Sequence, residues 1–329
     1  MFLQAFLSLS FPRGADSSRR GKLGREVEFV GFLQIACCIA VKCPIDAFTN
    51  VLMVECPRTG LGTGGLISIV EDNWRWRKQI VRLAVFDLVK RSRGTVLSWF
   101  WLFAKYLIRI FFFWFALDIG LRVGRDMDPP FFLWLVAGLV PWFFMSEMLS
   151  TGSNVFGRFS YLVNKIRFPL NGIPMIFSIA SGIVHLGMIV ALFVVYSLLK
   201  IPFDVYLLQV PFIAIVMFVF FYMNSLTFSL LSAFSKDFAN LVKAMVMPLF
   251  WLSGIIFDMS SVEILWIRDM MLFNPVTFFA TAYRDAFYYK VWVWENPLAL
   301  IAFIVVFAAT LIVMLMLNKR LAREVPDVL

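Results

Sequence analysis

Lys105, Arg109, Glu147 and His185 lie inside long apolar runs of this 329-residue chain, where a charged group is costly and needs a partner. At about 1.5 Å of helix rise per residue, Lys105 and Glu147 both fall in the inner third of the membrane. We therefore predict an ion pair between them, with Arg109 about one turn further out. The alternative is that Lys105 extends to the inner membrane surface. His185, the only histidine, either relays protons or forms a hydrogen bond between helices.

The sequence offers no set of residues for covalent catalysis. It has no Ser/His/Asp or Cys/His arrangement, no cluster of metal ligands, and no C-x2-C pair among its four cysteines. No G-x-x-x-x-G-K-[ST] segment occurs, so the chain cannot bind ATP through a P-loop. We expect a non-enzymatic chain without a catalytic residue, metal or cofactor of its own. Its net charge of +9, without an aromatic-basic recognition module, indicates membrane lipids rather than nucleic acid as partners.

The surrounding composition predicts an all-α integral membrane protein. Apolar residues make up 61% of the chain, which exceeds the usual share in soluble domains. A helix needs about 20 residues to cross the hydrocarbon core. Five runs are long enough for this, at 96–121, 131–149, 173–199, 205–233 and 297–317. A shorter run at 244–257, extended past Lys243, completes six predicted spans.

Three regions follow from this plan. Residues 96–329 form the predicted transmembrane domain, and residues 71–95 form a cytoplasmic amphipathic helix on the membrane surface. The apolar stripe of that helix is predicted to contain Trp74, Val81, Ala84, Val85 and Leu88. A basic loop is the alternative for this segment. Residues 1–70 do not fit the membrane plan and are interpreted as an atypical extension, either disordered or not translated.

Residues 258–296 carry more acidic than basic side chains, unlike the other connecting segments. Within them, Met270–Ala282 is too short to cross the membrane, and Asn274–Pro275 interrupts any helix. We predict a re-entrant segment before the last span. A helix lying flat on the outer surface is the alternative.

The basic residues outside the apolar runs determine the predicted orientation. They are concentrated before the first span, in the loop between spans two and three, and after the last span. The positive-inside rule places these segments, and with them both chain termini, in the cytoplasm. Six spans satisfy this arrangement, whereas counting Met270–Ala282 as a seventh span would place the basic tail outside.

The cytoplasmic loop contains "LVNKIRFPLN" at 162–171, a basic island followed by Phe168 and Pro169. The segments "GLVPWFFMSEMLSTGSN" (138–154) and "YLVNKIRFPLNGIP" (161–174) closely resemble the membrane subunits of ABC-2 exporters of O-antigen, capsule or teichoic-acid polysaccharides. "FNPVTFFATAYRDAFY" (273–288) and "RSRGTVLSWFW" (91–101) look like further segments of that family. The resemblance covers roughly 75–329. Ser98 stands where the family usually has glycine, and the proline usual near Lys105 is missing.

This resemblance implies an ABC-2 exporter fold and a subunit that borrows ATP energy from a separate nucleotide-binding ATPase, which holds the ATP and Mg. Val155–Phe168 would form a short coupling helix against that partner. The residues implied to couple the two are Arg158, Lys165, Arg167, Phe168 and Pro169, with the bases facing the partner and Phe168 filling an apolar notch. Two copies of the chain would form a homodimer that carries a lipid-linked glycan outward across the cytoplasmic membrane.

Aromatic residues, 17% of the chain, could line the path of a sugar polymer. The candidates for the channel or its outer mouth are Trp142, Phe143, Asn274, Pro275, Tyr283 and Arg284. The alternatives are an ABC-2 exporter of a drug or lipid and a proton-coupled secondary transporter, for which we find neither inverted repeats nor enough buried carboxylates. A membrane-bound glycosyltransferase is disfavoured further, because the acidic residues at 258–296 are scattered.

Overall fold

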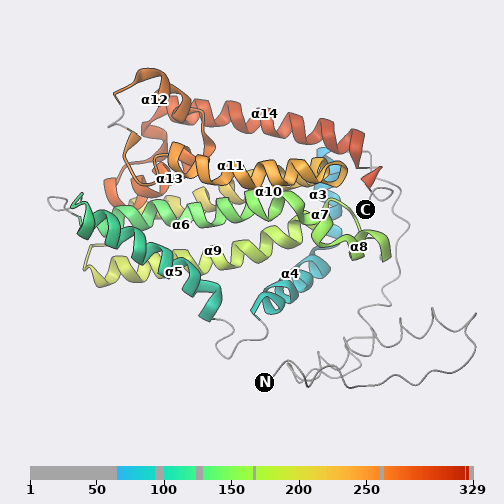
Figure 1. The fold of residues 1–329 in the computed structure, drawn as a ribbon, viewed down its shortest axis with the longest axis horizontal. Coiled ribbons are helices and arrows are strands. Elements are labelled where there is room, and N and C mark those ends of the chain that lie inside the picture. The colour runs from blue at the N-terminus through green and yellow to red at the C-terminus, as the bar shows by residue number, and fades with distance from the viewer. Residues whose placement is uncertain are drawn as a thin grey trace, which may run out of the picture. The chain divides into compact units, whose positions relative to one another are not determined.

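A computed structural model describes residues 65–92, 100–123, 129–165, 168–259, 263–322 and 324–325, which belong to one compact unit spanning 60–329 (Figure 1). Throughout these residues the secondary structure is helical, as predicted. The extension predicted at 1–70 lies almost entirely outside the described residues.

Within the described ranges, five helical stretches are long and apolar enough to cross a membrane, and they match the five long runs of the sequence. They are α5 (Phe100–Trp114) with its π-helical continuation η1 (Phe115–Gly120), α6 (Phe131–Ser150) with the short turns after it, α9 (Gly172–Leu198), η3 (Val205–Leu208) with α10 (Gln209–Phe234), and α14 (Pro297–Leu321). The chain is therefore a multi-pass membrane protein.

The sixth predicted span corresponds to α11 (Lys236–Leu252), which has 17 residues. It runs back alongside α10 in the opposite direction, as a sixth crossing requires (Figure 1). Its length falls just short of a full crossing by helix rise. The count of six therefore stays a prediction.

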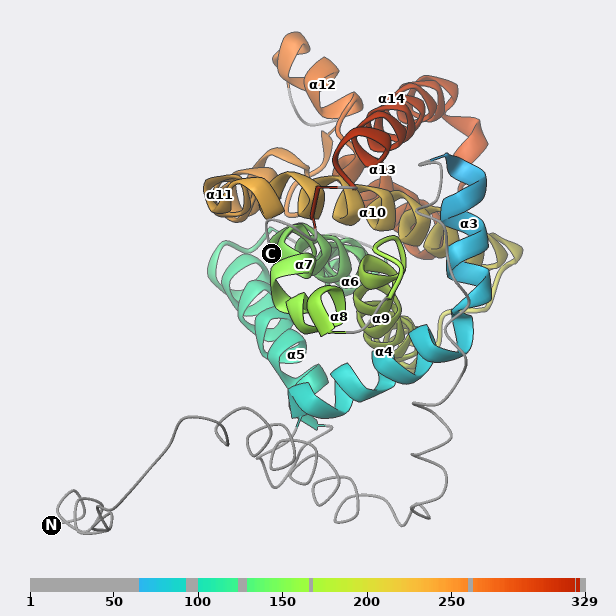
Figure 2. The same cartoon turned by 90° about the vertical axis from the view of Figure 1, so that its right-hand side faces the viewer.

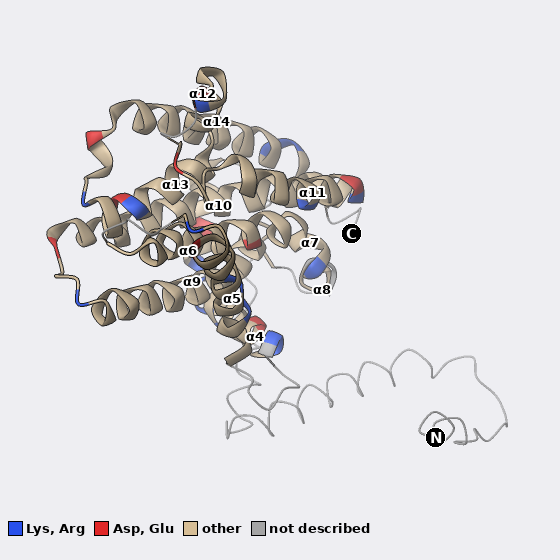
Figure 3. Ribbon diagram, turned by 60° about the vertical axis from the view of Figure 1, so that its left-hand side comes forward, with Lys and Arg blue, Asp and Glu red and all other residues tan. Residues whose placement is uncertain are grey.

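Helix α6 is the centre of the bundle, and α5, α9, α10 and α11 surround it in the end-on view (Figure 2). Within its apolar window 83% of the span is buried, against 22% for α5 and 17% for α14. Apart from Glu147, α6 carries no charged residue and is apolar on every side, so other helices can enclose it. Charged residues gather at the helix ends and on the helix before the first span (Figure 3).

The predicted interfacial helix is two helices, α3 (Leu66–Arg75) and α4 (Arg77–Ser92), which join at Trp76. The predicted stripe is only half right. Ala84 and Leu88 are buried and α4 packs on α9, but Trp74, Val81 and Val85 are exposed. The buried face of α4 instead consists of Ile80, Ala84, Asp87 and Leu88, so it includes a carboxylate that a purely apolar stripe would not.

The segment before the last span breaks into short helices, α12 (Leu265–Leu272), α13 (Pro275–Arg284), η5 (Asp285–Tyr289) and η6 (Val293–Glu295). The break falls at Asn274–Pro275, as predicted. There Asn274 Oδ1 accepts a hydrogen bond from the Val276 backbone N–H at 3.0 Å, and Pro275 occupies the first helical turn. Asn274 Nδ2 also donates to Ser253 Oγ at 2.8 Å, which ties α13 to the end of α11.

Candidate coupling site

The loop between α6 and α9 is built of three short helical turns, η2 (Gly152–Asn154), α7 (Val155–Arg158) and α8 (Ser160–Lys165), followed by the stretch 168–171. These turns are too short to be stable alone, so contacts with neighbouring helices must hold them. Val155 and Phe156 are completely buried, and Ser225 Oγ of α10 donates to the Gly152 carbonyl at 2.9 Å. The loop is thus fixed to the body of the bundle.

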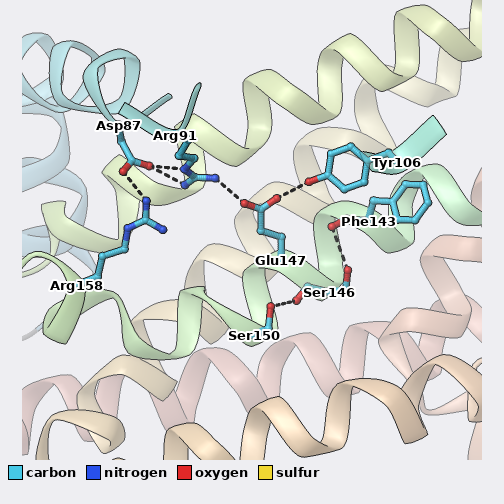
Figure 4. Close-up of polar contacts among 8 residues, drawn as sticks. All are labelled: Asp87, Arg91, Tyr106, Phe143, Ser146, Glu147, Ser150 and Arg158. Atoms are coloured by element: carbon cyan, nitrogen blue, oxygen red, sulfur yellow. Dashed lines mark hydrogen bonds and ion pairs between the residues drawn. The ribbon is translucent and has the colours of Figure 1, made fainter. Parts of the chain in front are cut away.

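At the start of the loop, Arg158 forms an ion pair with Asp87 of α4 (Figure 4). The Nη2–Oδ1 distance is 2.6 Å, and Asp87 is buried. The other Asp87 oxygen pairs with Arg91 one turn along α4, at 2.7 Å. One carboxylate therefore holds two guanidinium groups, and both of these also lie near the ring of Phe177.

Arg91 extends the network into the membrane domain by pairing with Glu147 of α6 at 2.5 Å (Figure 4). The second Glu147 oxygen accepts a hydrogen bond from Tyr106 of α5 at 2.6 Å. Only about one sixth of each partner's side chain is exposed, 15% for Arg91 and 16% for Glu147. Two arginines and two carboxylates balance one another in charge, which is the condition for burying ions at acceptable cost. The network links α4, α5, α6 and α7.

The predicted Lys105–Glu147 ion pair is wrong. Glu147 does have a basic partner, but that partner is Arg91. The Lys105 ammonium instead lies over the ring of Tyr106, 4.5 Å from its centroid, and its residue is exposed, as is Arg109. The rotation of α5 and the approach of α4 decided which base reached Glu147.

At the end of the loop a second cluster attaches α3. Phe168 is buried and meets Trp76 edge to face, with ring centroids 5.1 Å apart. Asn171 Nδ2 donates to Asp72 of α3 at 2.9 Å, and the Asn171 carbonyl accepts from Tyr222 Oη of α10 at 2.9 Å. Asn73 in turn donates to the same Tyr222 oxygen at 2.8 Å. Both ends of the loop are therefore attached to the α3–α4 pair.

These contacts correct two roles that the family resemblance implied. Phe168 does not project toward a partner, because it fills a site within the chain against Trp76 and Gly172. Arg158 is engaged by Asp87, although a third of its side chain, 33%, stays exposed. Pro169 lies between Phe168 and the start of α9, while the Lys165 side chain and Arg167 lie outside the described residues. On the described part of the loop, Tyr161 is the large hydrophobic residue that is exposed, at 43%.

The structure buries four of the candidate channel residues within the single chain. Trp142 packs against Phe250, and Phe143 packs against Tyr106 with ring centroids 4.9 Å apart. Tyr283 is completely buried, and its hydroxyl meets His185 Nε2 at 2.9 Å. His185 therefore forms the hydrogen bond between helices that was one of its two predicted roles. Asn274 and Pro275 cap α13, so none of these side chains forms an open wall in one chain.

Arg284 is buried beside the N-terminal half of α6, without an ion-pair partner among the described residues. Its guanidinium lies 3.4 Å from the Trp134 ring centroid and donates to three backbone carbonyls, Trp134 at 3.3 Å, Gly254 at 2.7 Å, and Ile255. Gly138 makes room for it, because a Cβ there would stand 2.6 Å from Nη2. Arg284 thus fastens α6, α13 and the segment after α11 together.

Two titratable groups near the outer loops have shifted pKa values. A hydrogen bond to Asp204 raises the pKa of Lys290, and the two groups form an ion pair at 2.5 Å. Burial raises the pKa of Asp285 to about 7, and Asp258 and Glu295 add to this shift. Among the described residues no group of His, Cys, Asp and Glu is arranged to hold a metal ion.

Sequence reasoning missed Asp87, Arg91 and Tyr106 as functional residues. A signal for Asp87 was present, because it is a rare acid among seven bases between Arg75 and Arg93. A single acidic residue in such a basic segment indicates that its carboxylate pairs with basic side chains. Nothing in the local pattern indicates that Tyr106, one residue after Lys105, turns inward while Lys105 turns outward.

Comparison with known proteins agrees with this architecture. The family model for the ABC-2 type transporter matches residues 78–288, so the chain belongs to the ABC-2 type transporters. The family implies a transport subunit that works with a partner ATPase. Among curated proteins, the O-antigen export system permease protein RfbA of Klebsiella pneumoniae is 26% identical over 206 residues, covering 61% of this chain and 76% of the relative. Its namesake from Myxococcus xanthus is 23% identical over 235 residues, covering 68% and 85%.

Proposed function

We propose that the chain is the membrane subunit of an ATP-driven exporter that moves a lipid-linked polysaccharide of the O-antigen type across the cytoplasmic membrane. Two relatives that cover most of its helical domain are named O-antigen export permeases. A drug or lipid exporter and a proton-coupled transporter are not favoured, and His185 is hydrogen-bonded to Tyr283 without a carboxylate in contact. A separate ATPase, which binds the ATP and Mg, supplies the energy.

The loop 152–171 is the surface on which that ATPase acts. The observation that carries this proposal is the attachment of both loop ends to α3 and α4, through Arg158–Asp87 and through Phe168–Trp76. A push on the loop therefore moves α3 and α4 with it. Through Arg91 and Glu147 the same push reaches α6, the buried centre of the bundle. Binding of nucleotide by the partner is thereby converted into displacement of a membrane helix.

The chain works as a homodimer, with both termini in the cytoplasm. Helices α5 and α11 meet through the rings of Phe113 and Phe250, whose centroids are 5.3 Å apart. Both helices keep large apolar side chains exposed, including Ile108, Phe112, Leu241, Met245 and Trp251. A second copy covers this surface, and the glycan passes between the copies. The basic residues of α3, α4 and the end of α14 lie at the end of the bundle that holds the loop, which fits a cytoplasmic location by the positive-inside rule (Figure 1).

Co-purification from the native host tests this proposal. Three tagged full-length proteins are extracted in mild detergent: the unmodified chain, the Tyr161→Glu variant and, as a matched control, the Phe203→Glu variant. Both positions are exposed, but they lie in loops at opposite ends of α9. We expect a P-loop ATPase to co-purify in stoichiometric amount with the unmodified chain and the Phe203 variant, and to be lost at least tenfold with the Tyr161 variant.

If the chain purifies without any ATPase, the proposal that it is an exporter subunit is overturned. An ATPase lost equally from both variants would overturn the placement of the coupling surface. The substrate is tested separately, by binding of a lipid-linked O-antigen against a small amphiphile to the reconstituted complex. Preference for the amphiphile would favour the drug or lipid exporter.

A further inference from the structure

A small cavity lies between α5, α6 and α9, next to Glu147 of the charge network. Its volume is about 10 Å³, which is close to the minimum that holds one water molecule. The polar groups in its wall come from three helices: Tyr106 of α5, Glu147 of α6, and Ser181 and His185 of α9. Phe143, Phe144 and Val140 enclose the remainder.

Two of these polar groups lack a hydrogen-bond partner among the residues that the structure describes. Ser181 Oγ and His185 Nδ1 are both buried, at 2% and 6% residue exposure, and neither has a partner. The two residues are four apart in the sequence, so they lie on the same face of α9. The Val140 carbonyl lies near His185 but not in hydrogen-bonding geometry. An unpaired buried polar atom destabilises the fold, so two in one cavity call for a ligand.

We infer that this cavity binds one ordered water molecule, which joins the charge network to the His185–Tyr283 pair. A buried water typically makes about three hydrogen bonds, and the wall supplies that number. The water accepts from Ser181 Oγ and His185 Nδ1 and donates to the Glu147 carboxylate, whose oxygens already accept from Arg91 and Tyr106.

This arrangement determines the tautomer of His185. Tyr283 Oη lies 2.9 Å from Nε2. The water donates its hydrogen bond to Glu147, so it accepts from His185 and Nδ1 must be a donor. Nδ1 therefore carries the hydrogen, and Nε2 accepts a hydrogen bond from the Tyr283 hydroxyl. A neutral imidazole with this tautomer leaves no buried atom of the ring unpaired.

With the water in place, hydrogen bonds run without interruption from Arg158 in the loop, through Asp87, Arg91 and Glu147, to His185 in α9 and Tyr283 in α13. Movement of the loop is thereby communicated to the segment before the last span. The water site stands apart from the export function, whereas this role in coupling rests on the proposed function.

Because His185 is the only histidine, a single labelled residue reports on the site. The full chain, labelled with ¹⁵N-histidine, carrying a tag without histidine and held in lipid nanodiscs, is examined by NMR. We expect one imidazole, protonated at Nδ1, with a magnetisation-transfer peak from water to the Nδ1 hydrogen. Ser181→Val fills the cavity and abolishes that peak. Ser178→Val, one turn earlier on α9 and bonded to the Pro174 carbonyl, keeps it.

A hydrogen on Nε2, or an unmodified chain without a water peak, overturns the water site. So does a water peak that survives in the Ser181 variant. Should that variant not fold, high-resolution density of the unmodified chain decides the question: a peak within hydrogen-bonding distance of Ser181, His185 and Glu147 supports the site, and an empty cavity refutes it. None of these readouts depends on export, so failure here is distinct from failure of the proposed function.

Discussion

At the end of the bundle that holds the loop 152–171, here called the inner end, the side-chain carboxylates of Asp87 and Glu147 hold Arg91 and Arg158. At the opposite end, here called the outer end, backbone carbonyls and the Trp134 ring hold Arg284. Carboxylates on separate helices can exchange partners when a helix shifts, while carbonyls move only with the backbone that carries them. The inner end is therefore suited to rearrangement and the outer end to rigidity. The predictions below test this difference.

The largest effect is expected at the outer end. Gly138→Ala places a Cβ 2.6 Å from Nη2 of the Arg284 guanidinium, which three buried hydrogen bonds hold in place. The overpacking should lower the free energy of unfolding by about 2–3 kcal/mol. Gly120→Ala is the control, because its Cβ would meet only an ordinary contact at 3.7 Å. Thermal unfolding in detergent measures both variants, and equal melting temperatures would show that Arg284 is not fixed.

The next effect is expected at the inner end, where a double-mutant cycle should show energetic coupling between Arg91 and Glu147. Arg91→Met and Glu147→Gln are expected to be non-additive in unfolding free energy by at least about 1 kcal/mol. Lys105→Met with Glu147→Gln should be additive within about 0.5 kcal/mol. Chemical denaturation of the four variants in each cycle provides the numbers. A larger coupling for Lys105 would restore the ion pair predicted from sequence.

Smaller effects are expected where the network reaches the loop. Asp87 is 4% exposed and serves two arginines, so Asp87→Asn should cost about 2 kcal/mol. The Arg158 side chain is 33% exposed, so water screens its ion pair with Asp87. Arg158→Gln should therefore lower the free energy of unfolding by about 1 kcal/mol or less. Arg158→Gln should nevertheless reduce export more than ATP hydrolysis in the reconstituted complex. The reverse order of the two stabilities would contradict the central position of Asp87.

The smallest effect concerns pH at the outer end. Folding raises the pKa of Asp285 from 3.8 to about 7, so the folded chain binds this proton more tightly than the unfolded chain. Its contribution to stability is complete below about pH 4 and is lost as pH rises through about 7. Partial exposure limits the change to about 1 kcal/mol. Melting temperatures between pH 5 and 8 should fall less steeply in Asp285→Asn, and identical slopes would exclude this group.

Much of the site's location, but little of its pairing, was predictable from the sequence. Glu147 was identified as an intramembrane carboxylate that needs a basic partner, and the loop with Arg158 was identified from its charge. The partner of Glu147 was not predictable, because Arg91 lies 56 residues away on a helix whose angle to α6 depends on packing. The predicted outward role of Phe168 failed for a related reason: a large apolar side chain beside a basic loop is as well suited to Trp76 as to another protein.

The sequence alone determined that this chain is a multi-pass helical membrane protein of the ABC-2 type, because apolar run lengths, charge asymmetry and local motifs are properties of contiguous residues. It also determined the break at Asn274–Pro275, since proline acts on its immediate neighbours. The tertiary structure decided which face of α4 is buried, which base pairs with Glu147, and how Arg284 is satisfied. Those outcomes depend on helix rotation and on close approach at Gly138, which arise only when helices distant in the sequence pack together.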